Sequence, residues 1–165
     1  MTDTQKQKKL EQLFEECKKE CDAVHIRYSQ KITLKITKRA TSRYGLCHKN
    51  PDGSYIITIS DFVFDSPDFK IKIVILHEMA HTCKKCMNHG VEWKKIANIL
   101  NEEYGYTISR TTSREAMELP PKSYKYAVKC KKCGCIIHKQ RLTKVIKNPS
   151  WYKCGFCGGT FERIK

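Results

Sequence analysis

Three histidines and a glutamate lie in one short stretch of the chain, ILHEMAHTCKKCMNHGVEW, residues 75–93. His77 and His81 are four residues apart, and Glu78 directly follows the first of them. Residues i and i+4 share one face of a helix, so both imidazoles could reach one metal ion. Glu78 would lie about 100° around the helix from His77, where it can approach a water beside the metal without ligating the metal. This is the H-E-x-x-H pattern of zinc hydrolases, with Glu78 as the catalytic base.

Two histidines leave a tetrahedral zinc ion short of one protein ligand and one open position. We expect His89 to be the third ligand, because Asn88 and Gly90 beside it favour a tight reversal of the chain. The reversal is required, since a continuous helix would carry His89 about 12 Å along its axis. A thiolate would donate more charge and make the zinc a poorer Lewis acid, so it ranks lower as a ligand. The alternatives to His89 are Glu92, Cys83 and Cys86.

A second set of metal ligands is predicted near the C-terminus. Two Cys-x-x-Cys pairs stand there with twenty residues between them, the spacing of a four-cysteine zinc site. Four thiolates close the tetrahedron, so this zinc would be structural and would replace the large core that so short a segment cannot bury. The sequence therefore predicts two zinc ions, one catalytic and one structural. The structural ligands would be Cys130, Cys133, Cys154 and Cys157, with Cys135 left over.

The elements that position these residues can be read from apolar spacing. Residues 4–25 are predicted to form an amphipathic helix, because Leu10, Leu13 and later apolar residues recur at helical spacing. Residues 32–37 alternate like a half-buried strand. Residues 55–60 form a second strand after a turn, and residues 43–47 are a candidate pairing strand.

Two further helices are expected around the histidines. Ser66 is predicted as an N-cap, with Pro67 at the first position of a helix that runs to about Cys83. Residues 89–104 form the next helix, and Gly105 ends it. Helices combined with a small sheet make this an α+β protein.

The positive charge of the chain is concentrated in its last quarter. The net charge is +15, and residues 121–165 hold twelve Lys or Arg against one acid, Glu162, which leaves +4 for residues 1–120. Pro120 and Pro121 predict a break between two modules, 1–118 and 122–165. Basic residues that neutralise phosphates give sequence-independent nucleic-acid binding. The expected DNA-binding residues are Lys131, Lys132, Lys139, Arg141, Lys144 and Lys147.

Aromatic residues alternate with these charges, and two interpretations of them stay open. They could stack on the bases of single-stranded or disrupted DNA, or they could form the core of a small module. The residues concerned are Tyr124, Tyr126, Trp151, Tyr152 and Phe156.

Cysteine usage and hydropathy indicate the compartment. No stretch approaches a membrane span, and the N-terminus lacks the apolar segment of a secretory signal. Ten cysteines are then expected to be reduced or metal-bound. We expect an intracellular protein of a reducing compartment, nucleus or cytoplasm, with no membrane association, and a monomer.

The segment LHEMAH…NHGVEW resembles the SprT-like family of zincin metallopeptidases. Members have H-E-x-x-H, a loop of variable length, then His-Gly and an aromatic residue, here His89, Gly90 and Trp93. SRYGLC followed by a turn and YIITIS resembles the Gly-x-Cys segment of the family, and many members end in a zinc ribbon. The resemblance covers about residues 30–165. One departure is the short loop, which contains Cys83 and Cys86.

The resemblance implies a zincin-like metallopeptidase domain with the H-E-x-x-H helix packed on a small sheet, followed by a small β zinc ribbon. Some family members cleave proteins crosslinked to DNA. It thus implies a zinc-dependent endopeptidase, with DNA and DNA-bound proteins as partners. Two alternatives remain: a non-catalytic DNA-binding zinc protein of the same fold, against which the intact Glu78 argues, and a general intracellular peptidase.

Overall fold

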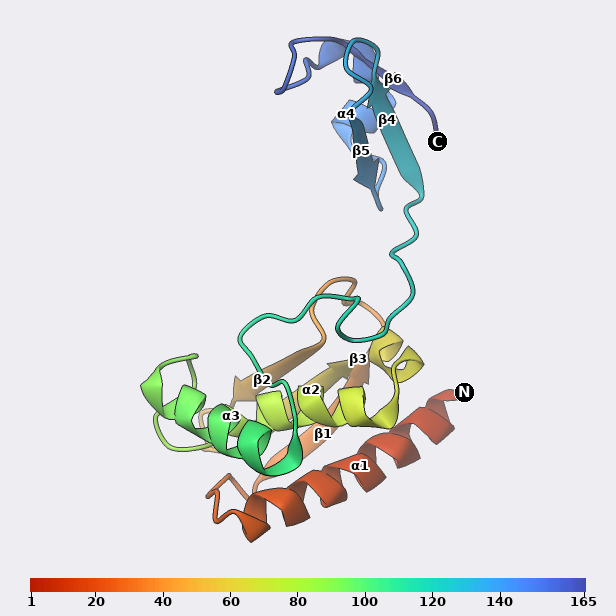
Figure 1. The fold of residues 1–165 in the computed structure, drawn as a ribbon. Helices are drawn as coiled ribbons and strands as arrows, with labels where there is room; N and C mark the ends of the chain where they lie inside the picture. The colour runs from red at the N-terminus through yellow and green to blue at the C-terminus, as the bar shows by residue number, and fades with distance from the viewer. The chain divides into compact units, whose positions relative to one another are not determined.

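The chain folds into two units in the computed structural model, which describes residues 1–165 (Figure 1). The first unit is Met1–Pro120 and the second is Pro121–Lys165. Both combine helices with a small sheet, so the predicted α+β class is confirmed. None of the helices combines the length and the apolar character that a membrane span requires.

The N-terminal unit begins with the long helix α1, Asp3–Ala23. Thr2 caps it: the backbone N–H of Gln5 donates to the Thr2 hydroxyl, and the Thr2 N–H donates to the Gln5 side chain. The predicted helix 4–25 is confirmed, except that it ends at residue 23. Its buried side is the predicted apolar side, made of Leu10, Leu13, Phe14, Cys17 and Cys21.

Three strands form the sheet of this unit in the order β1-β3-β2. They are β1 (Ile32–Thr37), β2 (Gly45–Lys49) and β3 (Tyr55–Ser60). The central strand β3 runs parallel to β1 and antiparallel to β2. The candidate strand 43–47 is therefore found two residues later, because Gly45 is the first residue that pairs with β3. Because β2 is the last strand in this order, one of its edges has no partner strand.

A short 3₁₀ helix η1 (Asp61–Asp65) leads into α2 (Asp68–Ala80), the most buried helix of the unit. The prediction that Ser66 caps α2 is wrong. The Ser66 N–H donates to the Val63 carbonyl and ends η1, while Pro67 takes the cap position in extended conformation. The Ser66 hydroxyl is buried and has no hydrogen-bond partner.

Helix α2 also ends earlier than the predicted Cys83: Ala80 is its last residue and His81 is its C-cap. Helix α3 spans Val91–Tyr104 and stops at Gly105, whose φ of 68° is left-handed, as predicted. Helix α2 packs against α1, α3, β2 and β3 (Figure 1). The chain then runs without regular structure from 105 to 120 and buries Tyr106, Ile108, Met117 and Leu119.

The C-terminal unit is built on a second three-stranded sheet, antiparallel throughout, in the order β5-β4-β6. Its core is small and includes two of the cysteines: Val128, Cys130, Ile146, Cys154 and Phe161. The elements are β4 (Tyr126–Cys130), β5 (Ile136–Lys139), α4 (Lys144–Lys147), η2 (Pro149–Trp151) and β6 (Phe161–Arg163).

Candidate metal centres

The last turn of α2 and the start of α3 bring three imidazoles together. His77 and His81 come from the end of α2, and His89 comes from the loop just before α3. One ligand atom of each ring lies within 4.8 Å of the other two, and the Nε2 atoms of His77 and His89 are 3.0 Å apart. The chain reversal expected for His89 is present, because Gly90 caps α3 rather than continuing α2.

Backbone carbonyls fix the orientation of the two helix histidines. The Nδ1 atom of His77 lies 3.1 Å from the Ser109 carbonyl, and Nδ1 of His81 lies 2.7 Å from the Cys86 carbonyl. A carbonyl only accepts, so each Nδ1 carries the proton and each Nε2 presents a lone pair. The indole of Trp93 packs against all three rings, with centroid distances of 4.6–5.7 Å.

The surroundings keep these imidazoles neutral, which is the form that binds metal. Burial, with smaller contributions from His81 and His89, lowers the pKa of His77 to about 4. Burial also lowers the pKa of His81 and of His89.

The other residues considered as third ligand make different contacts. The Glu92 carboxylate pairs with the Lys95 ammonium at 3.0 Å. The Cys86 sulfur lies 3.4 Å from the Lys84 carbonyl, and the Cys83 sulfur lies 3.9 Å from the Met79 carbonyl. Among the donors near His77 and His81, the structure thus places His89 in the group and none of these three.

Glu78 is buried, with 6% of its surface exposed, and lies against β2. Burial raises the pKa of its carboxyl to about 8, partly offset by the Cys47 N–H and the charge of Arg43. A Cβ on Gly45 would stand 2.5 Å from the Glu78 Oε1 atom, so only glycine leaves room for the carboxylate there. Sequence reasoning did not assign Gly45 this role; the Gly-x-Cys pattern around it was the available signal.

This arrangement fits a zinc ion of the catalytic type. Three neutral nitrogen donors converge, and three protein ligands leave the fourth tetrahedral position open. A cavity of about 280 Å³ lined by His77 and Glu78 gives access to this side of the site. The carbonyls of Ser109 and Cys86 that orient His77 and His81 belong to the backbone, which every residue type has. The sequence therefore could not indicate them.

The C-terminal unit gathers the four predicted cysteines. The sulfurs of Cys130 and Cys157 are 3.4 Å apart, those of Cys133 and Cys154 are 3.7 Å apart, and all four lie within 4.8 Å of one another. Backbone N–H groups, foremost that of Cys133, lower the pKa of the Cys130 thiol to about 6. Four sulfurs fit a closed, structural zinc site, and Cys135 is exposed and outside the group.

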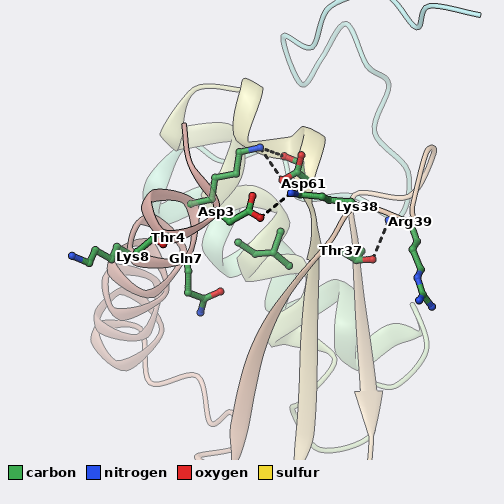
Figure 2. A pocket seen from close by; sticks show the side chains of 10 residues that line it. Asp3, Thr4, Gln7, Lys8, Thr37, Lys38, Arg39 and Asp61 are labelled. Carbon is green, nitrogen blue, oxygen red and sulfur yellow. Dashed lines mark hydrogen bonds and ion pairs between the residues drawn. The ribbon is translucent and has the colours of Figure 1, made fainter.

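A larger cavity of the N-terminal unit lies elsewhere, between the start of α1 and the end of β1 (Figure 2). Its volume is about 720 Å³, and ion pairs cross it: Lys38 with Asp3 and Lys6 with Asp61, each at 2.8 Å. Its two acidic groups are therefore already paired, whereas Lys8 and Arg39 take part in none of the ion pairs. None of the metal-ligand groups lines it.

Comparison with known proteins identifies the family of the N-terminal unit. The sequence profile of the SprT-like family matches residues 9–114, which is most of the chain. The chain belongs to the SprT-like family. The matched residues include the three histidines and Glu78, so the SprT-like region contains the whole nitrogen site.

One solved structure similar to this SprT-like chain is the crystal structure of the metallopeptidase zymogen of Pyrococcus abyssi abylysin. The two share 15% sequence identity with a TM-score of 0.41, over 66% of this chain and 86% of the other. A search of curated proteins finds no match.

The two donor sets predict a distinct loss of metal for each variant. Purified protein should hold about two zinc ions, with His81→Ala losing one and Cys154→Ser losing the other. Because three ligands hold an ion less completely than four, a chelator should remove the histidine-bound ion first. Elemental analysis before and after dialysis against chelator measures both effects. A His81→Ala protein that retains two zinc ions would contradict the nitrogen site.

Proposed function

We propose that this SprT-like chain is a zinc-dependent endopeptidase that acts on DNA-associated or DNA-crosslinked proteins. The observation that supports it most directly is the buried Glu78 carboxylate, which follows His77 on α2 at the point where the three imidazoles of His77, His81 and His89 converge. On this proposal the N-terminal unit is a zincin-like domain and the C-terminal unit is a four-cysteine zinc ribbon.

Each residue of the nitrogen site has a role in peptide hydrolysis. His77, His81 and His89 would hold the zinc, which when bound polarises the scissile carbonyl and makes a water more acidic. Glu78 accepts a proton from the attacking water and passes it to the leaving amine. The Gly45 backbone leaves room for the carboxylate, so β2 fixes where that proton transfer occurs.

The same pocket offers one tyrosine to stabilise the developing oxyanion. Tyr44 lines the cavity with Glu78. The hydroxyls of Tyr104 and Tyr106 donate instead to Glu20, at 3.1 Å and 2.8 Å. Of the three tyrosines considered from the sequence, Tyr44 is therefore the one that fits this role.

The C-terminal unit supports the DNA part of the proposal. Trp151 is 79% exposed and Phe156 is 88% exposed, so neither belongs to the small core. Exposed aromatic rings among cations provide a platform on which bases of single strands stack. None of the ion pairs of the structure involves this unit, so its Lys and Arg side chains are free to meet phosphates. Lys131, Lys132, Arg141, Lys144 and Lys147 are exposed, and Lys139 is half-buried.

Replacing the base tests the catalytic proposal. Glu78→Gln should keep both zinc ions but lose turnover by roughly 10²–10⁴-fold, the usual contribution of a general base. The assay is cleavage of a DNA-bound protein with and without single-stranded DNA. Glu92→Gln, which alters an exposed carboxylate outside the site, is the matched control. Cleavage by Glu78→Gln at the natural rate would refute the mechanism and favour a non-catalytic or differently catalysed activity.

Gly45 gives a second test that leaves every donor atom in place. Gly45→Ala places a methyl group where Glu78 Oε1 now lies, so the carboxylate must move. A displacement of about 1 Å can cost about 10²-fold in rate, and we expect a loss of that order with unchanged zinc content. Gly155→Ala is the control, because a Cβ there meets nothing within 4 Å. Equal activity of Gly45→Ala and the natural chain would show that the fit against β2 does not position the base.

DNA binding can be divided into stacking and charge. The double variant Trp151→Ala, Phe156→Ala should weaken single-strand binding by roughly tenfold or more, at about 1–3 kcal/mol per stacked base. Lys131→Gln with Lys132→Gln should instead reduce the log–log salt slope by about 1.4, at about 0.7 per phosphate contact. Fluorescence anisotropy between 50 and 200 mM salt measures both. Phe69→Ala, an exposed aromatic of the other unit, is the control. Unchanged affinity and slope in both variants would exclude this unit as the DNA-binding surface.

A further inference from the structure

The cavity beside Glu78 has apolar walls and a basic rim. Val74, Ile73 and Met117 are at most 5% exposed and form its apolar wall. Arg43 and Arg110 line it from two separate segments, one just before β2 and one after α3. Its volume of about 280 Å³ suits one amino-acid side chain rather than a larger ligand.

The two rim arginines have no partner within the protein. Neither guanidinium takes part in any ion pair or side-chain hydrogen bond of the structure, and both side chains are exposed. Apart from the buried Glu78, the residues lining the cavity carry no acidic group. An anion entering there would meet two free cations and no competing surface carboxylate.

The two arginines also belong to the two segments that contact the reacting groups. Arg43 stands two residues before Gly45, against which the Glu78 carboxylate packs, and Arg110 directly follows Ser109, whose carbonyl lies 3.1 Å from Nδ1 of His77. Each guanidinium is thus near one wall of the catalytic site. A side chain held between them belongs to a residue next to the bond that is cleaved.

We propose that this cavity is a specificity pocket for an acidic substrate side chain, glutamate or aspartate, with Arg43 and Arg110 as the selecting residues. The inference rests on the proposed peptidase function. The apolar wall accepts the methylene groups, and a guanidinium binds a carboxylate through two parallel hydrogen bonds. A DNA phosphate is the weaker fit, because a backbone phosphate has no stem to fill the buried apolar wall.

Peptides that differ at one position test the selection. Two sets of fluorogenic peptides carry Glu, Gln or Lys on either side of one scissile bond, and the zinc-loaded full chain is the enzyme. In one set, kcat/KM should favour Glu over Gln by about tenfold, the size of one charge-assisted hydrogen bond at a partly exposed site. Arg43→Gln and Arg110→Gln should each reduce kcat/KM for the Glu peptide severalfold more than kcat/KM for the Gln peptide, so that the Glu-to-Gln ratio falls toward one. Arg110→Glu should shift the preference toward the Lys peptide. The control is Arg39→Gln, which removes an arginine from the cavity between α1 and β1 and should leave the Glu-to-Gln ratio unchanged.

Binding to the Glu78→Gln chain separates this inference from the peptidase proposal. Tighter binding of the Glu peptide than of the Gln peptide, lost in Arg43→Gln and Arg110→Gln, supports the pocket even where the natural chain cleaves nothing and the peptidase proposal fails. Cleavage with equal kcat/KM for Glu and Gln in both sets overturns the pocket and leaves the peptidase proposal standing. A loss of single-stranded DNA affinity in the arginine variants, with peptide selectivity unchanged, also overturns it and assigns the arginines to phosphates.

Discussion

The close approach of β2 to the last turns of α2 is the constraint on which the candidate site depends. Helix α2 is buried on most of its surface, because α1, α3 and the sheet all pack against it. A carboxylate in such a place is costly unless its environment compensates. Strand β2 supplies part of the compensation, since Gly45 leaves room for Glu78 and the Cys47 N–H favours the charged form, although burial still raises the pKa of the carboxyl to about 8. The Glu78 carboxylate, the proposed base, is therefore held by the fold and not by its own helix alone.

The same fold explains why the short connection between α2 and α3 is enough to bring His89 to the other two histidines. Helix α2 stops at Ala80, and the chain turns through Lys85, which has a φ of 62°, before α3 begins at Val91. That turn places the Cys86 carbonyl on His81 and returns His89 to the end of α2. Trp93, one turn into α3, fills the space behind all three rings. The two cysteines of the loop therefore contribute a backbone carbonyl and packing, while the candidate third ligand is His89, three residues after Cys86.

Features that depend on the type and spacing of side chains could be predicted from the sequence, whereas features that depend on backbone conformation and strand pairing could not. The H-E-x-x-H helix, the paired cysteines and the apolar side of α1 depend on residue type at fixed spacing, so they were visible. The parallel pairing of β1 with β3 depends on a crossing of the chain that alternation alone does not encode. The cap of α2 was misassigned because Ser-Pro suits two backbone arrangements, and the preceding η1 decided between them. Exposure removed one of the two interpretations for Trp151 and Phe156, because neither belongs to the core, and stacking on bases stays a prediction.

The two candidate metal sites favour the metal-binding form of their donors by different physical routes. In the N-terminal unit a large core removes water from the imidazoles, and burial lowers their pKa values so that they stay neutral. In the C-terminal unit the core is too small for that, and burial would in any case disfavour thiolates. Backbone N–H groups aimed at Cys130 and Cys154 lower the pKa values of these two thiols instead, while the neighbouring sulfurs raise the pKa of Cys133. The nitrogen site thus depends on the packing of its whole unit, whereas the sulfur site depends on local turns and can itself stabilise the small unit that contains it.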